Sequence, residues 1–310
     1  IRLDNNESNP ADYRSLQQAI DGASAGDTLY VAGSGDPYET ATLNKPLTVI
    51  GPGFFFAGNP NAPARAAAAV IEALAIVPGA EGSSLIGLTF GLGSYDVPEE
   101  SDFLISADSI TVQRCRFFYR SRRRVQIRSS NNIITSVFFE GGTELIIESG
   151  GDNVVSNSHL RIYEELPNAG YTLFKHNVVS FSIESLNNTY AIDNILLRTK
   201  SVALNNVTYE HNISEGDQFG SEQGNQSNVQ PEDLFVGAEA PSPDAFYQLR
   251  VGSPALGAGL NGEDIGMFGG SIPYVLSGLP PIPTITSFDA PVSGTEENGL
   301  PINIRIRSNQ

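Results

Sequence analysis

A short apolar strand pattern returns about once every twenty residues between positions 108 and 214, and it constrains the fold more than any other feature. The first copy has its anchors at Val112, Cys115 and Phe117. Later copies place residues at the same offsets: Ile134, Val137 and Phe139; Val155, Ser158 and Leu160; Phe174, Asn177 and Val179; Ile192, Ile195 and Leu197; and, more weakly, residues 207–213. This period predicts stacked parallel strands, because helical repeats need units of about 33 to 47 residues.

Asparagines crowd the corners between these strands, as at Asn131, Asn153, Asn188 and Asn206. Asparagine tolerates left-handed backbone and hydrogen-bonds its own chain two residues on. Stacked asparagine side chains also form ladders between neighbouring strands. Turn chemistry explains these residues better than sugar binding at polar corners, which is the alternative reading.

Both ends of the repeat carry segments that suit the ends of a solenoid. Residues 13–23, after Asp12, have apolar side chains at helical spacing, and residues 28–31 form the first expected strand. Two glycine-rich segments, residues 252–259 and 264–270, follow the last copy. With the repeat, these features resemble the right-handed parallel β-helix superfamily, the pectate-lyase-like fold, and its secreted bacterial members, over roughly residues 12–268. The resemblance implies that the glycine-rich segments close the solenoid and carry no chemistry.

We therefore predict an all-β protein. Residues 28–270 form a right-handed parallel β-helix solenoid, and residues 1–27 form an N-terminal strand and a capping helix. Residues 271–310 form a Pro-rich C-terminal extension that ends in a β-strand, because alternate residues there are apolar. A terminal strand needs a partner, either on its own solenoid or on another copy of the chain. The assembly candidates are Ile1, Leu3, Ile302, Ile304 and Ile306.

The composition limits the partners of the chain. It has 18 Lys and Arg against 35 Asp and Glu, a net charge of −17, which disfavours nucleic acid and anionic membranes. Calcium or a local basic patch would be needed to attract an anionic polysaccharide. No apolar run is long enough for a transmembrane helix, and the single cysteine excludes a disulfide within the chain. Without a signal peptide or initiator Met, the N-terminus looks mature or trimmed, so we expect a secreted, extracellular or cell-surface protein.

The one basic cluster of the sequence lies between Arg114 and Arg128. Its anion-binding candidates, for a carboxylated or sulfated glycan, are Arg120, Arg122, Arg123 and Arg124. The alternative is a solvated flank that pairs with Glu140, Glu144 and Glu148 on the adjacent coil. We favour the second reading, because most exposed charge runs are simply solvated.

The sequence contains no complete catalytic motif. Calcium-dependent lyases of the resembled superfamily need clustered carboxylates and an Arg or Lys base. The best candidates for such a group are Lys175, Arg198, Glu184 and Asp193, and the adjacent pair Glu164–Glu165 is the only tempting pair for hydrolysis. Repeat position accounts for the three histidines, His159, His176 and His211. We predict no metal site and no cofactor, with calcium only if the protein is a lyase.

The leading functional hypothesis is a secreted, non-catalytic structural or adhesive protein that assembles with other copies of itself into a filament or layer through its terminal strands. The alternative is a carbohydrate-active enzyme, a polysaccharide lyase or glycoside hydrolase acting on acidic glycans. A third reading is passive carbohydrate binding on an exposed face of the solenoid. The alternatives rest on analogy with the fold, which does not determine function.

Overall fold

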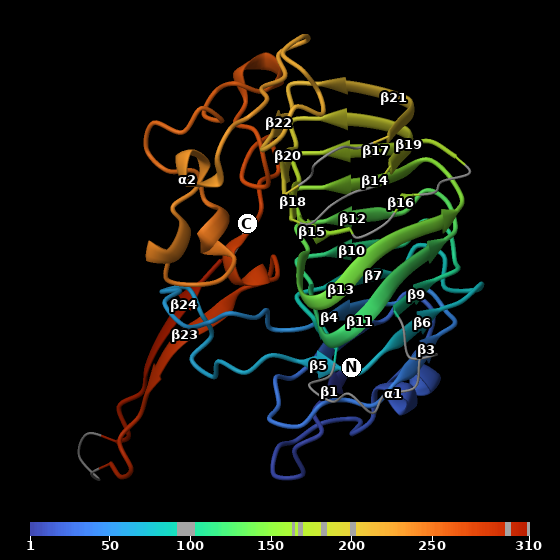
Figure 1. The fold of residues 1–310 in the computed structure, drawn as a ribbon. Helices are drawn as coiled ribbons and strands as arrows, with labels where there is room; N and C mark the ends of the chain where they lie inside the picture. The colour runs from blue at the N-terminus through green and yellow to red at the C-terminus, as the bar shows by residue number, and fades with distance from the viewer. Residues whose placement is uncertain are drawn as a thin grey trace.

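The chain winds into a parallel β-helix of about eight turns, as the repeat predicts (Figure 1). This is seen in a computed structural model that describes residues 1–91, 103–162, 165–166, 170–180, 185–198, 203–294 and 299–308. Strand pairing divides the solenoid into three faces, here called face 1, face 2 and face 3. The predicted all-β fold class is confirmed.

Each face is a stack of parallel strands. Face 1 contains β1 (Arg2–Leu3), β2 (Thr28–Val31), β4 (Thr48–Ile50), β7 (Ser84–Ile86), β10 (Thr111–Gln113), β12 (Ile133–Thr135), β14 (Asn153–Ser156), β17 (Thr172–Lys175) and the second halves of β19 (Ser185–Ile192) and β21 (Ala203–Glu210). Face 2 contains β5 (Val70–Ile71), β8 (Thr89–Phe90), the first parts of β11 (Arg116–Arg128) and β13 (Phe138–Ser149), β15 (His159–Arg161), β18 (Val178–Ser180), β20 (Ile195–Leu197) and β22 (Ile213–Ser214). Face 3 contains β3 (Ala41–Leu43), β6 (Leu74–Ile76), β9 (Phe103–Ile105), the last parts of β11 and β13, β16 (Glu165–Leu166) and the first parts of β19 and β21.

The repeat anchors fill the interior of the solenoid. Val112, Cys115 and Phe117 are fully buried, as predicted. The alignment of the fifth copy was wrong by one residue, because Phe174 pairs with Ala191 and Val179 pairs with Leu196. The residues predicted at those positions, Ile192, Ile195 and Leu197, are one position later in the strands and therefore lie on the opposite side of the sheet. Two of them, Ile195 and Leu197, pack in a second hydrophobic cluster outside the solenoid.

A ladder of buried asparagines runs along one corner. Asn177 donates from its side chain to Asn194 Oδ1, Asn194 donates to Asn212, and Asn212 donates to Asn225, over 3.0, 3.0 and 3.2 Å. Because each of these side chains is at most 4% exposed, they satisfy buried backbone groups rather than bind sugars. Other corner asparagines, such as Asn131, adopt positive φ, as turn chemistry predicts.

The N-terminal end is capped by α1 (Leu16–Gly22), which begins later than residue 13 and buries Leu16, Ala19 and Ile20. Strand β1 belongs to face 1. Leu3 is fully buried there, and the Ile1 amino group donates to Thr28 O over 2.9 Å. Both assembly candidates at this end therefore pack within their own solenoid.

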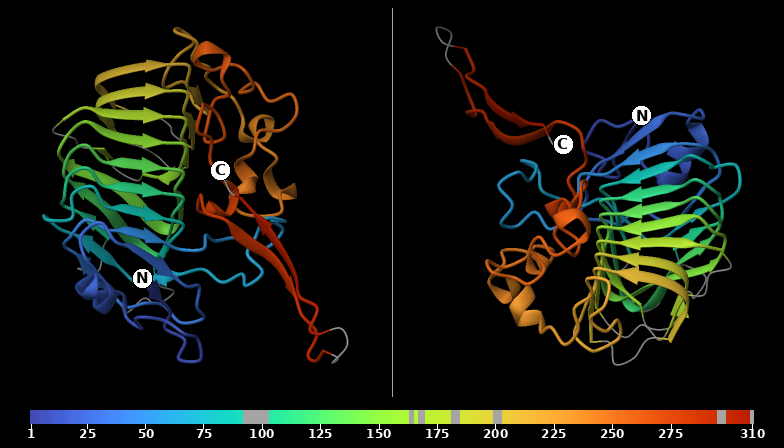
Figure 2. Two further views of the ribbon diagram at one scale, coloured as in Figure 1. Left: turned by 180° about the vertical axis from the view of Figure 1, so that it is seen from behind. Right: turned by 90° about the horizontal axis from the view of Figure 1, so that it is seen from above.

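Residues 219–226 continue the coil stack at its C-terminal end, whereas residues 230–278 lie along face 2 (Figures 1 and 2). The short elements of this second stretch are α2 (Pro231–Leu234), η1 (Gly237–Glu239), η2 (Ala245–Tyr247), η3 (Leu260–Gly262) and η4 (Leu276–Gly278). Its apolar residues, including Phe235, Ile265 and Met267, pack against face-2 residues such as Val178 and Ile195. We call residues 230–278 the flanking segment.

The C-terminal strand finds its partner in the Pro-rich extension. Strands β23 (Thr284–Asp289) and β24 (Asn303–Arg307) form an antiparallel hairpin that projects from the body of the protein (Figure 2). Ile285 O accepts from Ala64 N over 2.8 Å, so the base of the hairpin contacts the N-terminal half. The assembly candidates Ile302, Ile304 and Ile306 are about half exposed or more.

The basic cluster between Arg114 and Arg128 is mostly paired in the described residues. Its ion pairs bridge adjacent coils: Arg116–Glu140 (2.6 Å), Arg124–Glu144 (3.4 Å) and Arg128–Glu148 (2.6 Å). This agrees with the solvated-flank reading for Arg124. Arg120, Arg122 and Arg123 belong to β11, and their side chains lie outside the described part of the structure.

Candidate functional site

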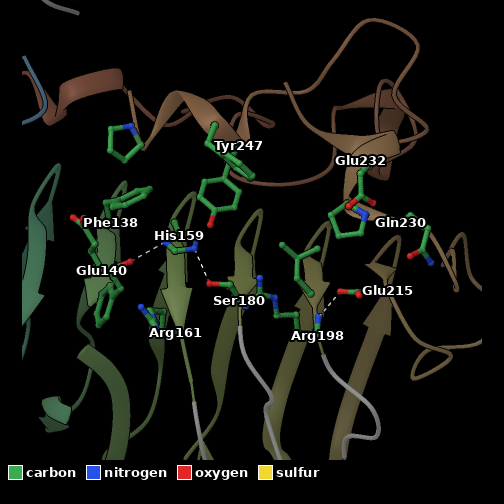
Figure 3. A pocket seen from close by; sticks show the side chains of 15 residues that line it. Phe138, Glu140, His159, Arg161, Ser180, Arg198, Glu215, Gln230, Glu232 and Tyr247 are labelled. Atoms are coloured by element: carbon green, nitrogen blue, oxygen red, sulfur yellow. Dashed lines mark hydrogen bonds between the residues drawn. The ribbon is translucent and has the colours of Figure 1, made fainter. Parts of the chain in front are cut away.

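A cleft of about 570 Å³ separates face 2 from the flanking segment (Figure 3). Its floor comes from β13, β15, β18 and β20, and its opposite wall comes from residues around α2 and η2. Polar and aromatic side chains line it: Phe138, Glu140, His159, Arg161, Ser180, Arg198, Glu215, Gln230, Glu232, Phe246 and Tyr247. Pockets with aromatic walls and a few placed polar groups are typical of ligand sites.

The floor of the cleft is a column of side chains in register. His159 pairs with Phe138 and Val178, and extending the same register places Glu140, Arg161, Ser180, Leu197 and Glu215 on successive coils. Neighbouring strands are about 4.8 Å apart, so Glu140 and Glu215 are separated by about 19 Å along the column. The column presents both signs of charge along one line.

His159 lies at the centre of the floor and is held on every side. Its ring stacks between Phe138 and Tyr247, with ring centroids 4.6 and 4.3 Å away. Nδ1 lies 2.9 Å from Phe139 O and Nε2 lies 2.8 Å from Ser180 Oγ. Because a carbonyl only accepts, Nδ1 carries the proton and Ser180 donates to Nε2.

Burial lowers the pKa of His159 to about 3, and the nearby Arg161 charge lowers it further, although the hydrogen bond to Phe139 O opposes the shift. Ser180 and His159 thus have the spacing of a nucleophile and its base. Compared with an ordinary histidine, however, forming the imidazolium costs on the order of 5 kcal/mol more here. The pair is therefore a poor proton acceptor and serves to fix the floor.

Tyr247 of the opposite wall contacts the floor of the cleft. Burial raises the pKa of its hydroxyl, and its hydrogen bond with Ser180 opposes this rise. The neighbouring Phe246 is 38% exposed and lines the same cleft. The flanking segment thus supplies one aromatic ring that closes the floor and a second that faces solvent.

The predicted catalytic group does not converge. Arg198 lines the cleft beyond β20, whereas Lys175 ends β17 on face 1, in register with Ile192. Asp193 lies at the corner between faces 1 and 2, where its Oδ1 accepts from Leu260 N over 2.9 Å. Glu184 and Glu164 are outside the described residues, and the side chain of Glu165 is also outside them.

One interpretation of the histidines needs correction, and the structure adds a cluster around His176. His176 and His211 occupy the same positive-φ corner, but His159 lies within β15. The absence of a metal site stays a prediction, but the sequence did not indicate a cluster of His176, Asp193 and Glu263, whose ligand atoms lie within 4.8 Å of one another. Zinc motifs are recognised by short spacings, whereas these residues meet only because coils stack and the flanking segment folds back.

The cleft residues were also missed from the sequence, although a signal existed for half of them. Glu140 and Arg161 each follow an anchor of the repeat, Phe139 and Leu160, by one residue. Nothing periodic in the sequence indicates Glu232, Phe246 or Tyr247.

Comparison with known proteins adds no assignment, because no protein-family model matches the chain and no curated protein matches it.

No helix among the described residues is long and apolar enough to cross a membrane.

Proposed function

We propose that the protein is a secreted, non-catalytic adhesive β-helix that binds an acidic oligosaccharide in the cleft on face 2. The observation that carries this proposal is the column of Glu140, Arg161, Ser180 and Glu215 beneath the aromatic wall of the flanking segment (Figure 3). The repeat and the resemblance of both ends support membership among the secreted bacterial proteins of the pectate-lyase-like superfamily.

The cleft suits a chain of polar sugars with acidic groups. Arginine binds carboxylate and sulfate through two parallel N–H donors. Arg161 and Leu197, the neighbour of Arg198, are two coils apart, about 10 Å. Two such cations give separate positions for two acidic groups along one oligosaccharide. With a net charge of −17, the protein needs these local cations to hold an anion.

The geometry favours binding over cleavage. Glycoside hydrolysis by paired carboxylates needs them about 5 to 9.5 Å apart, and Glu140 and Glu215 are about 19 Å apart. Glu140 also pairs with Arg116, and His159 is a poor base. Of the described floor residues, the two carboxylates are therefore too far apart to act as a hydrolytic pair.

The proposal is tested by calorimetry with oligouronates, sulfated oligosaccharides and neutral oligosaccharides of equal length. Arg161→Gln should weaken acidic-ligand binding at least about tenfold, as expected for losing one charge-assisted contact of about 1.5 kcal/mol or more. Arg65→Gln, an exposed cation outside the cleft, is the matched control and should bind normally. Equal affinity of both variants, or no preference for acidic ligands, would reject the proposal.

A cleavage assay on the same ligands separates the enzymatic alternative. Glu215 on the floor and Glu232 on the opposite wall both lie at one end of the cleft (Figure 3). New reducing ends or unsaturated uronates that disappear in both Glu215→Gln and Glu232→Gln would make the protein a carbohydrate-active enzyme. We expect intact ligand from all three proteins, with and without calcium.

Self-assembly through the hairpin is the second candidate, and the exposed isoleucines of β24 favour it. Both strands of a two-stranded sheet have an unpaired edge, which can accept a strand from a second copy. Electron microscopy of the whole chain beside a truncation ending at Pro283 tests this. Filaments or layers that vanish on truncation would support assembly, whereas single particles from both proteins would exclude it.

A further inference from the structure

One corner of the solenoid carries a positive-φ residue on each of several successive coils. These residues join face 1 to face 2: Arg114, Ser136, Asn157, His176, Asp193 and His211, all with φ between 48° and 57°. Left-handed backbone is uncommon outside glycine, asparagine and aspartate. The coil stack therefore holds His176 directly beside Asp193, and the backbone of the two coils is joined by His176 N donating to Ile192 O over 3.1 Å.

The flanking segment brings a second carboxylate to this corner. Glu263, just after η3, places Oε2 3.2 Å from His176 Nε2, and Asp193 Oδ2 lies 3.5 Å from the same nitrogen. The side chains of His176 and Asp193 are 5% and 2% exposed, whereas Glu263 is 40% exposed. The cluster is buried on the solenoid side and open to solvent on the side of Glu263.

We propose that His176, Asp193 and Glu263 form a binding site for a first-row divalent transition-metal ion of the zinc type. One imidazole nitrogen and two carboxylate oxygens are the donors such ions take in three-ligand sites, with solvent at the remaining positions. Calcium fits poorly, because it takes six to eight oxygen ligands. The bound ion would fasten the flanking segment to the solenoid.

The separations match a shared metal ion. Ligand bonds of about 2.0–2.1 Å in tetrahedral geometry place neighbouring ligand atoms about 3.3–3.4 Å apart. The two separations from His176 Nε2, 3.2 and 3.5 Å, bracket this value. Asp193 Oδ1 already accepts from Leu260 N, so that bond orients the carboxylate and leaves Oδ2 for the ion.

His176 meets the two carboxylates through Nε2, and its other ring nitrogen faces the protein interior. Among the described residues, His176 Nδ1 is buried and has no hydrogen-bond partner. Glycine backbone shapes the space around the ring, since a Cβ on Gly270 would lie 2.7 Å from Nε2. The carboxylates of Asp193 and Glu263 both approach His176 Nε2, so a cation between them would offset their mutual repulsion.

The neighbouring His211 is not a fourth protein ligand of the proposed site. It follows Asp193 in the corner column, and its Nδ1 lies 3.1 Å from Ala258 O. That carbonyl fixes the proton on Nδ1. The nitrogens of His211 lie outside the group of atoms that fall within 4.8 Å of one another, so His211 is a flanking residue.

The test uses the tag-free chain, loaded with zinc chloride, dialysed, and analysed by inductively coupled plasma mass spectrometry. The wild type should retain about one zinc per chain, and cobalt loading should give a visible absorption spectrum of low-symmetry coordination. Glu263→Gln should lose at least about tenfold in zinc affinity, since one of its charged ligands becomes neutral. Glu239→Gln, an exposed glutamate elsewhere on the flanking segment, is the matched control and should bind as the wild type does.

Thermal unfolding gives a second readout that separates metal binding from folding. Zinc at about one hundred times its dissociation constant should raise the Tm of the wild type by roughly 4 °C for a chain of this length. Glu263→Gln should melt like the wild type without zinc, and the same zinc concentration should raise its Tm by no more than about 2 °C, since a tenfold weaker site halves the stabilisation. Substoichiometric zinc in the wild type, or equal zinc retention in Glu263→Gln, would show an ion pair only and overturn the proposal.

Discussion

Replacing His159 with glutamine should remove a large part of the acid sensitivity of the fold. The folded-state pKa of His159 is about 3, far below the ordinary value of 6.5. Below pH 6.5 the unfolded chain therefore binds a proton at this position and the folded chain does not. Stability rises with pH wherever the unfolded state binds more protons, so this group costs stability as pH falls from about 6.5 towards 3.

The magnitude follows from the two pKa values. Between pH 7.5 and pH 5, the histidine should lower the free energy of unfolding by about 2 kcal/mol, and by pH 4 by about 3 kcal/mol. The value at pH 5 depends only on the folded-state pKa lying well below 5. Glutamine does not titrate, so His159→Gln should lose stability at neutral pH through lost stacking yet lose about 2 kcal/mol less than the wild type on going to pH 5.

Urea unfolding at pH 7.5 and pH 5 measures both quantities, and contributions from other groups cancel in the difference between proteins. Ser180→Ala is the matched control. It removes the hydroxyl that donates to Nε2 but keeps the imidazole, so it should lower stability by about 1 kcal/mol at both pH values and retain the wild-type pH dependence. If His159→Gln lost as much stability between pH 7.5 and 5 as the wild type, the buried neutral histidine would be refuted.

Two further predictions concern groups inside the solenoid. Asn194→Ala should lower the free energy of unfolding by about 3–5 kcal/mol, because Asn194 donates to Phe174 O and Asn212 Oδ1 and accepts from Asn177. About 1–3 kcal/mol is lost for each buried group left unsatisfied. Asn205→Ala, in the exposed pair with Asn187, should cost about 0.5 kcal/mol or less in the same urea experiment, and similar costs for both variants would contradict the argument from burial. Burial raises the pKa of Cys115 to about 12, so a thiol-reactive dye at pH 8 should label the chain only after unfolding, and rapid labelling of the native protein would place this residue at the surface.

The sequence predicts the solenoid well because most of its interior positions are apolar and many of the polar ones recur at fixed corners. Val112 and Phe117 recur at fixed offsets since each coil must fill the same narrow core. The fifth copy was misaligned for a physical reason. Leu196 faces the interior, and Leu197 on the opposite side is also buried, so the alternation that distinguishes inside from outside is lost there.

The candidate sites were harder to predict because each needs residues from outside the repeat. The position one residue after each anchor predicts that Arg161 points out of the solenoid, in line with residues of the neighbouring coils. It does not predict that the flanking segment covers this line and forms a cleft. Tyr247 and Glu263 belong to the flanking segment. The position of this segment on the solenoid depends on the packing of Ile265 and Met267 against face 2. No local spacing encodes that contact.

The flanking segment therefore determines the positions of both candidate binding sites. A bare strand stack presents a nearly flat face, on which a ligand buries little surface. When the flanking segment covers the rungs around Val178 and Ile195, it leaves a trench along Arg161 and Ser180 on one side and a buried corner at His176 on the other. Both sites thus depend on the same apolar contact. A metal ion at the corner would strengthen that contact, so zinc loading should also rigidify the wall that carries Tyr247.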